Sequence, residues 1–463
     1  MLHSATTPVS AEPIRCSATH ARYFQCGDTT WIPVGANLCF PRFYNSPEDG
    51  LATLRRYLDA LADNGGNYTR LFLGHPLFDI EANGLGCFDT GKAQQLRALL
   101  DHAHARGIRV KLTLELFRTI DPQPQAEVFP GALNFSRPLY HTANGGKFDT
   151  LDEYLQSEAG HRHFLAKLDW LIERLGDHPA AFGWELWNEM NALRSPHWPA
   201  WTDAMLPELK RRLPQRLVMQ NLGSFDRDDK RVPYDRIMPL PSNDIAQVHR
   251  YLDFGAPWTI CQGPVDMMMA DAITELRRIA PGKPVLLSEG GAVEPNHARP
   301  WDLYAKDRDG IVMHDVLFAP FFAGSAGSGQ PWHWHEYIDR NDLWWHFRRF
   351  TRAIEGIDPV REAFTPARQD TQRLRVYALR GKDTSLLWCR DTACDWQTEL
   401  RDGTPPAPVT GETLKLPHGN GSAPPTVLDV YDPWTDAWTS TSPSNDTIAL
   451  PTFTRSLVIR VRH

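Results

Sequence analysis

The sequence predicts an α/β protein, a (β/α)8 TIM barrel followed by a small C-terminal antiparallel β-sandwich. Short apolar runs alternate with segments of helical spacing from about residue 31 to about residue 355, which is typical of a parallel sheet with crossover helices. From about residue 365, short β-rich runs are separated by Pro, Gly, Ser and Thr, as in a sandwich. A chain of 463 residues exceeds what one hydrophobic core usually supports, so we expect two domains, at 1–360 and 361–463.

The barrel region contains eight apolar runs that we interpret as strands. The helix after the first run is marked by Leu51, Leu54, Leu58 and Leu61, which recur every three or four residues along one helix face. Similar spacing predicts helices around 96–103 and 164–175. No Gly-x-Gly-x-x-Gly motif follows the first strand, which disfavours a Rossmann sheet. The expected strands are 31–40, 67–73, 108–116, 182–191, 216–224, 244–252, 283–291 and 330–338.

Four runs rich in β-branched and aromatic residues predict the strands of the sandwich. They are separated by turn residues, and the segment 403–425 is rich enough in Pro and Gly to predict a surface loop or an irregular hairpin. The four runs are RLRVYALRG (373–381), TSLLWCRD (384–391), PTVLDVYDP (425–433) and RSLVIRVRH (455–463).

Composition and charge exclude several classes of partner. The net charge is −7, and no basic run offers a footprint for phosphates, so we expect no nucleic acid. Nowhere do 18 apolar residues run together, so we expect no membrane partner. Seven unclustered cysteines without a C-x-x-C motif suit reduced thiols, and the first 25 residues lack a secretory apolar block, so we expect a cytoplasmic location. A signal segment trimmed from the sequence is the alternative.

The high tryptophan content favours a carbohydrate partner. The chain has 16 Trp, many of them between residues 184 and 345. Core filling explains some of them, but indole rings are also flat platforms for the apolar faces of sugars. The sequence does not set the oligomeric state.

Polar residues at the expected strand ends are the candidates for chemistry, because barrel enzymes carry their sites there. Glu189 and Glu289 follow the fourth and seventh strands, so the barrel could bring their carboxylates together across its mouth. Cleavage of a glycosidic bond requires two carboxylates in different environments, one protonated and one ionised. The other candidates are Asn37, Arg70, Glu115, Asn188, His249, Tyr251, Trp332 and Trp334.

These motifs resemble a known group. Trp187-Asn188-Glu189 and Ser288-Glu289-Gly290 look like the paired signatures of clan A retaining glycoside hydrolases, and the nearest likeness is to family 5, the cellulase and mannanase family. The likeness covers roughly residues 31 to 340, as short motifs in the right order. It implies that Glu189 is the acid/base and Glu289 the nucleophile. It also implies that Arg70 lies beside the nucleophile, that His249 and Tyr251 form a His-x-Tyr pair, and that a Trp of the eighth strand is a sugar platform.

The sequence departs from this pattern at three places. Met190 stands where Pro commonly follows the acid/base, Gly290-Gly291 replaces an aromatic-Gly pair, and Glu115 occupies a position where many relatives carry His. Structural roles compete with functional ones at single positions, since a Glu after an apolar strand is often a solvated loop residue. Arg70 could form a structural ion pair at the barrel rim with Glu115 as its partner, and His249 and Tyr251 could simply pack.

We expect neither a metal nor a cofactor. The His-x-His pairs at 161/163 and 333/335 have no third ligand at diagnostic spacing. On a strand, Trp332 and Trp334 would share one face and His333 and His335 the other.

The sequence thus predicts a retaining β-glycoside hydrolase, in which buried indoles such as Trp184 and Trp187 raise the pKa of Glu189. A transglycosylase with the same residues and a non-catalytic carbohydrate-binding protein are the alternatives. The sugar, the linkage and the choice between exo and endo cleavage stay open. We expect the segments 117–160 and 292–310 to shape the subsites.

Overall fold

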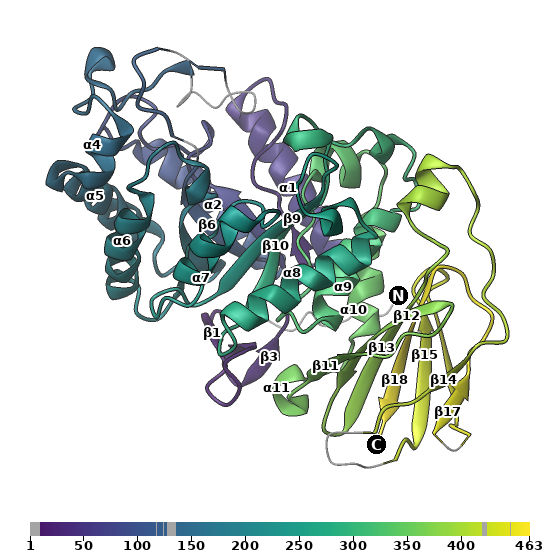
Figure 1. Cartoon of the computed structure of the whole chain (residues 1–463). Coiled ribbons are helices and arrows are strands. Elements are labelled where there is room, and N and C mark those ends of the chain that lie inside the picture. Colours follow the sequence, from purple (N-terminus) through teal and green to yellow (C-terminus); the bar gives the residue numbers. More distant parts are fainter. Residues whose placement is uncertain (1–9, 117, 124, 127–135, 419–423, 445) are drawn as a thin grey trace.

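A computed structural model describes residues 10–116, 118–123, 125–126, 136–418, 424–444 and 446–463. Its larger part is a barrel of parallel strands enclosed by helices, and an antiparallel sheet structure lies beside it (Figure 1). Five neighbouring strands of the barrel form one hydrogen-bonded sheet, and two more strands form a separate two-stranded sheet. The first five are β4 (Gly35–Ala36), β5 (Tyr68–Phe72), β6 (Arg109–Glu115), β7 (Ala181–Trp187) and β8 (Leu217–Met219), and the pair is β9 (Ala246–Leu252) and β10 (Val285–Ala292).

The barrel closes through backbone hydrogen bonds on both sides of the β9–β10 pair. Between β8 and β9, Asp244 N–H donates to Val218 C=O at 2.9 Å. Beyond β10, Gln330 N–H donates to Leu287 C=O at 3.0 Å, and Asn37 N–H donates to Pro331 C=O at 3.1 Å. The eighth position is therefore a short extended segment that joins β10 back to β4.

The expected strand at 330–338 is wrong beyond Pro331. His333 adopts a left-handed conformation with φ 57°, and a π-helix then runs from Trp334 to Asp339. The predicted arrangement, with two indoles on one face of a strand and two histidines on the other, does not form. The chain leaves the extended conformation at His333, so Trp334 and His335 are not part of a strand.

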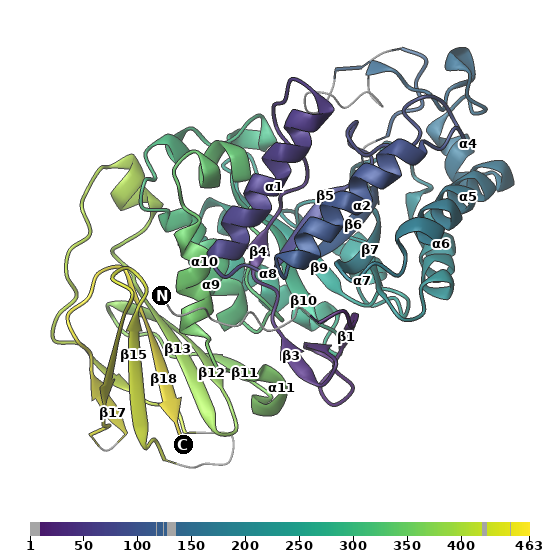
Figure 2. The same cartoon turned by 180° about the vertical axis from the view of Figure 1, so that it is seen from behind.

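Helices cover the outside of the strands, as Figures 1 and 2 show from opposite sides. In α1 (Pro47–Asp63) the predicted leucine stripe is buried, and Ser46 caps the helix by accepting the N–H of Asp49 at 3.2 Å. None of the helices in the described residues is long and apolar enough to cross a membrane. The main helices after α1 are α2 (Thr90–Ala105), α5 (Glu158–Leu175), α6 (Trp198–Arg212), α7 (Arg231–Ile237), α8 (Val265–Ile279), α9 (Ile311–Phe322) and α10 (Trp345–Ala353).

A small antiparallel sheet near the N-terminus closes the end of the barrel opposite the carboxyl ends of its strands. It consists of β1 (Ile14–Cys16), β2 (Phe24–Cys26) and β3 (Thr29–Trp31). Phe24 packs edge-on against Phe182 at the start of β7, with ring centroids 5.4 Å apart. The single strand expected at 31–40 is thus divided between β3 and β4, and this sheet was not predicted.

The C-terminal part is the predicted antiparallel structure. Six strands form a sheet in the order β11-β12-β13-β18-β15-β16, and β14 and β17 pair beside it. Alternate residues of the sheet, such as Leu387 and Ile459, bury a separate apolar core between the two layers. The strands are β11 (Thr365–Arg368), β12 (Leu374–Arg380), β13 (Thr384–Asp391), β14 (Thr413–Lys415), β15 (Val427–Asp432), β16 (Ala437–Thr441), β17 (Thr447–Ala449) and β18 (Ser456–Arg462).

The other face of the six-stranded sheet packs against α8 and α9 of the barrel. Trp388 of β13 lies against Phe318 of α9, with ring centroids 5.9 Å apart. Two buried arginines of the sheet make bidentate ion pairs with these helices. Arg375 binds Asp266 at 2.6 and 3.0 Å, and Arg390 binds Asp315 at 2.8 and 3.2 Å.

Candidate active site

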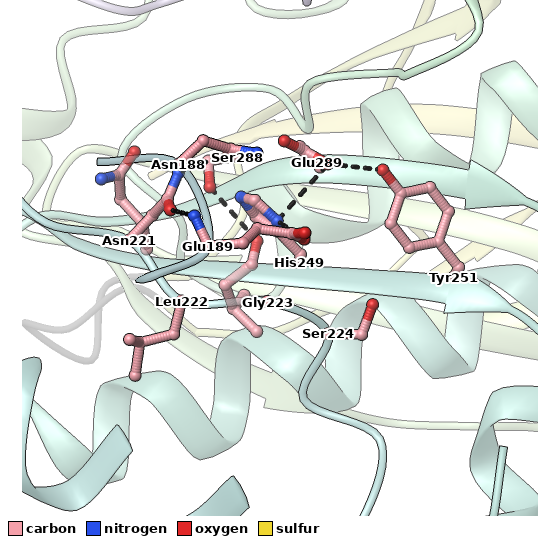
Figure 3. Close-up of polar contacts among 12 residues, drawn as sticks. Asn188, Glu189, Asn221, Leu222, Gly223, Ser224, His249, Tyr251, Ser288 and Glu289 are labelled. Carbon is pink, nitrogen blue, oxygen red and sulfur yellow. Dashed lines mark hydrogen bonds and ion pairs between the residues drawn. The ribbon is translucent and has the colours of Figure 1, made fainter. Parts of the chain in front are cut away.

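The carboxyl ends of four barrel strands bring six of the sequence-predicted residues into contact with one another. Figure 3 shows Asn188 and Glu189 on one side, Glu289 and Tyr251 on the other, and His249 between them. This is the end of the barrel at which parallel strands present their following loops. The set consists of Arg70 from β5, Asn188 and Glu189 after β7, His249 and Tyr251 from β9, and Glu289 from β10.

Glu289 is a buried carboxylate held by donors on both oxygens. Arg70 Nη1 donates to Oε1 at 2.6 Å, and the hydroxyl of Tyr251 donates to Oε2 at 2.6 Å. The residue is only 4% exposed. An ionised carboxylate can accept both bonds at once, so its orientation is fixed before any ligand arrives.

Arg70 is itself fixed from three further directions. Its Nη2 donates to Glu185 Oε1 at 2.5 Å and to Asn188 Oδ1 at 2.6 Å, and its Nε donates to Thr113 Oγ1 at 2.9 Å. Arg70 and these three partners are all buried, with at most 4% exposure. Its carboxylate partners are Glu185 and Glu289, so the alternative pairing of Arg70 with Glu115 does not form.

Glu185 extends this network into the barrel interior. Its Oε2 accepts from Lys111 Nζ at 3.1 Å and from Gln247 Nε2 at 2.9 Å. Burial opposes ionisation of Glu185, but Arg70 and Lys111 outweigh that effect and lower its pKa to about 2. Burial also lowers the pKa of Lys111, to about 8. A buried charge is tolerated here because it is paired and hydrogen-bonded.

Glu189 occupies a different environment from Glu289. Its backbone is left-handed, with φ 49° and ψ 51°, a conformation that costs a non-glycine residue on the order of 1 kcal/mol. Burial raises the pKa of its carboxyl group, and the nearby His297 and Arg70 only partly offset that effect. The direction agrees with the sequence-based expectation for an acid at this position.

His249 bridges the two carboxylates. Its Nδ1 lies 2.7 Å from Glu189 Oε1 and 3.4 Å from Glu289 Oε2, and its side chain is fully buried. Burial lowers the pKa of His249 to about 4, so the ring is neutral near pH 7, and Nδ1 shares a hydrogen bond with Glu189 Oε1. Through this ring the two acids are coupled without direct contact.

Glu189, His249 and Glu289 are also the group of described residues whose geometry comes nearest to a metal site. One donor atom from each lies within 4.8 Å of the other two. A cation there would lie beside the guanidinium of Arg70, which already binds Glu289, and it would displace the hydrogen bond between His249 Nδ1 and Glu189. The arrangement therefore suits proton transfer better than metal binding.

A pocket of about 300 Å³ opens beside Tyr251, whose hydroxyl binds Glu289. Its lining also includes His297 and Trp332. Trp332 is half-buried, whereas Trp334 is 3% exposed and packs edge-on against it at a centroid distance of 5.0 Å. Trp332 can thus offer an indole surface to a ligand, while Trp334 mainly supports it. Val293 and Pro300, from the segment 292–310, also line the pocket.

Glu115 and Asn37 bind other protein groups instead of facing this pocket. Glu115 accepts from Lys167 Nζ at 2.6 Å and from Arg118 Nη2 at 2.8 Å, in a fully buried ion cluster. Asn37 Nδ2 donates to the carbonyls of Ser288 at 3.0 Å and Gln330 at 3.2 Å, across the seam where the barrel closes. Among the described residues, neither side chain makes a hydrogen bond or an ion pair with the carboxylate of Glu189 or Glu289.

A larger hollow of about 610 Å³ lies next to the segment 117–160. Its walls include Arg118 and Asp121 from that segment, and Leu193 and Arg194 from the loop that follows Glu189. Residues 117, 124 and 127–135 of the predicted subsite segment lie outside the described residues.

Two residues of the site were not singled out from the sequence. Glu185 could have been found, because a Glu in the middle of the apolar run FGWELW must be buried and paired. Asn221 Oδ1 accepts the backbone N–H of Glu189 at 2.6 Å, and no sequence signal indicates that contact.

Comparisons with known proteins agree with this fold. No protein-family model matches the sequence, and no curated protein sequence matches it. Among solved structures, a glycoside hydrolase is similar over 98% of both chains, with 13% identity and a TM-score of 0.61. A glycoside hydrolase family 5 protein from Bacteroides vulgatus covers 98% of this chain and 94% of its own, with 14% identity and a TM-score of 0.61. An endo-β-1,4-mannanase from Thermotoga petrophila covers 93% and 98%, with 13% identity and a TM-score of 0.51. The chain therefore has the fold of family 5 glycoside hydrolases.

Proposed function

We propose that this protein is a retaining β-glycoside hydrolase that acts by double displacement, with Glu289 as nucleophile and Glu189 as acid/base. One observation carries the proposal: an oxygen of Glu189 and an oxygen of Glu289 lie within 4.8 Å of each other at the mouth of the barrel. Retaining enzymes place their carboxyl groups about 5 to 5.5 Å apart, whereas inverting enzymes need roughly 6.5 to 9.5 Å to admit a water. The short separation favours retention.

The environment of each acid supports its proposed role. Glu289 would attack the anomeric carbon and form a glycosyl-enzyme ester, while the bond to the leaving oxygen breaks. Arg70 and Tyr251 would hold the carboxylate in line for this attack, since each already donates to it at 2.6 Å. Removal of either donor would let the carboxylate rotate.

Glu189 would give its proton to the leaving oxygen in the first step. In the second step its carboxylate would take a proton from water, which attacks the anomeric carbon and releases Glu289. A general acid must hold its proton near the working pH, and burial raises the pKa of Glu189 in that direction. His249, neutral and bonded to Glu189 Oε1, would orient the carboxyl group.

The proposed substrate is a β-linked glycoside or oligosaccharide. Trp332 and Tyr251 give the 300 Å³ pocket the aromatic surface that sugar rings favour. The fold is shared with glycoside hydrolases, and one of those neighbours is an endo-β-1,4-mannanase. We also propose a cytoplasmic location, which is supported by seven free cysteines.

The stereochemistry of the first product tests the mechanism. A panel of 4-nitrophenyl β-glycosides would identify a sugar that the protein hydrolyses, and proton NMR would then follow the anomer formed first. We expect the β-anomer before mutarotation. An α-anomer would rule out Glu289 as a nucleophile, and binding without turnover across the panel would favour the non-catalytic alternative. Transfer to an added acceptor sugar in preference to water would favour the transglycosylase.

A further inference from the structure

Asn221 lies two residues beyond β8, beside the turn that carries Glu189. Its side-chain oxygen accepts the backbone N–H of Glu189 at 2.6 Å, and its Nδ2 donates to Asn188 Oδ1 at 3.4 Å. The residue is fully buried. Figure 3 shows Asn221 next to Asn188, on the side of the site away from Tyr251. Asn221 thus contacts the main chain of one acid and has no contact with the carboxylate of the other.

The segment around Asn221 is tied to the Glu189 turn at two more points. Gln220 Nε2 donates to Trp187 C=O at 2.5 Å, and Gly223 N–H donates to Asn191 Oδ1 at 2.7 Å. The first of these bonds holds Trp187, before Glu189, and the second holds Asn191, after it. Asn221 binds Glu189 itself, between the two. The left-handed turn is therefore held along its whole length by one neighbouring segment.

Asn221 also closes a series of hydrogen bonds between the two acids. Asn188 Oδ1, which receives Asn221 Nδ2, accepts from Arg70 Nη2 at 2.6 Å as well. Arg70 Nη1 in turn donates to Glu289. The backbone of Glu189 and the carboxylate of Glu289 are thus joined through three buried side chains.

We propose that Asn221 is a positioning residue that holds Glu189 in its left-handed turn, so that the carboxyl group faces the bond to be cleaved. The inference rests on the proposed function. A glutamate in this conformation is strained, and it persists only where its surroundings fix it. Without Asn221 the buried N–H of Glu189 loses its acceptor, and a rotation of the turn toward another acceptor would carry the carboxyl group away. Protonation of the leaving group in the first step and activation of water in the second both depend on that placement, and kcat/KM reports the first of these steps.

The test compares Asn221→Ala with Asn243→Ala. Asn243 is an equally buried asparagine that binds Gln220 N–H at 3.1 Å and Ile237 C=O at 3.2 Å, without contact to Glu189. The probes are 2,4-dinitrophenyl and methyl β-glycosides of the sugar that the wild type hydrolyses. We expect Asn221→Ala to lower kcat/KM for the methyl glycoside ~100-fold and for the dinitrophenyl glycoside less than ~3-fold, because the activated leaving group needs little protonation.

A purely structural role would lower kcat/KM equally for both substrates, as we expect for any loss caused by Asn243→Ala. An equal loss in folded Asn221→Ala would therefore overturn the proposal. Asn221→Asp keeps an acceptor for the Glu189 N–H and adds a negative charge, so it should retain turnover of both substrates and move the alkaline limb of the pH profile upward. If the alkaline limb of the pH profile of Asn221→Asp stayed where it is in the wild type, that result would also contradict the role of Asn221.

A readout without turnover separates the two proposals. A crystal structure of Asn221→Ala should show residues 188–190 displaced from the left-handed turn, and a turn that stays in place would overturn the inference. A wild-type protein that hydrolyses no β-glycoside would count against the proposed function alone.

Discussion

Arg70 Nη1 lies 2.6 Å from Glu289 Oε1, and Arg70 Nη2 lies 2.5 Å from Glu185 Oε1, so one guanidinium binds two buried carboxylates at once. Glu185 belongs to the interior of the barrel and Glu289 to its mouth. The planar guanidinium fits this geometry because it presents donors in a rigid fork. The orientation of the proposed nucleophile is therefore set by the ion network of the barrel interior.

Arg70→Lys should impair both catalysis and folding. A lysine ammonium cannot reach Glu185, Glu289 and Asn188 together, so one buried carboxylate loses its partner. We expect kcat to fall ~100-fold and the free energy of unfolding to fall by about 2 kcal/mol. Steady-state kinetics and urea unfolding measure the two effects.

The control for this substitution is Arg56→Lys. Arg56 makes a comparable bidentate pair with Asp339, at 2.7 and 2.8 Å, but its side chain is 56% exposed. Exposed pairs contribute less than about 1 kcal/mol, so this variant should resemble the wild type in both assays. Equal effects of the two substitutions would contradict a special role for Arg70.

The pH dependence of turnover should report the raised pKa of Glu189. The acid must be protonated, so kcat/KM for substrates with poor leaving groups should fall as the pH rises through that pKa, which burial places above the usual range of a glutamate. In Glu189→Gln this alkaline limb should disappear from the profile of an activated aryl glycoside. A limb that persists unchanged would assign the titration to another group.

Chelation should leave turnover unchanged. The three donors of Glu189, His249 and Glu289 lie close enough for a metal, but Arg70 contributes a positive charge beside them. Prolonged dialysis against EDTA, followed by assay with and without added Zn²⁺, measures this. A loss of turnover that one added metal restores would show that the group is a metal site.

The sequence predicted most strands within a few residues, because apolar runs that fill a parallel barrel are continuous and distinctive. The run at 384–391 corresponds to β13 residue for residue. The prediction of a strand at 216–224 is wrong after Met219, where the chain stops pairing with its neighbouring strands. Instead, the side-chain amides of Gln220 and Asn221 bind the Trp187 C=O and the Glu189 N–H.

Contacts across the barrel were harder to predict than its strands. Only the resemblance to family 5 glycoside hydrolases implied that Arg70 lies beside Glu289. The partners of Glu115 are Arg118, from the following loop, and Lys167, from α5, and strand order says nothing about either. Asn221 is a loop residue 32 positions from Glu189, so its contact depends on a local departure from the strand.

The sandwich should stabilise the barrel through its buried ion pairs. Arg390 is fully buried and binds Asp315 of α9 at 2.8 and 3.2 Å. Asp315→Asn leaves a buried guanidinium without its counter-charge, so we expect the free energy of unfolding to fall by about 3 kcal/mol. Thermal and urea unfolding measure it. Asp383→Asn, which removes the charge of an exposed pair with Arg361, is the control and should change little.

Azide rescue should separate the roles of the two acids. Glu289→Ala removes the proposed nucleophile, so turnover should fall by at least ~10⁴-fold, and azide should restore part of it by filling the vacated space and giving an α-glycosyl azide. Glu189→Ala should still form the glycosyl-enzyme from a dinitrophenyl β-glycoside, whose leaving group needs little protonation, but hydrolysis of that intermediate should be slow because the attacking water has lost its base. Azide needs no base, so it should attack the glycosyl-enzyme, raise turnover and give a β-glycosyl azide. Proton NMR of the azide products distinguishes the anomers. If the two variants gave the same anomer, the assignment of one acid to each step would be wrong, and an exchange of the two anomers between the variants would reverse the roles of Glu189 and Glu289.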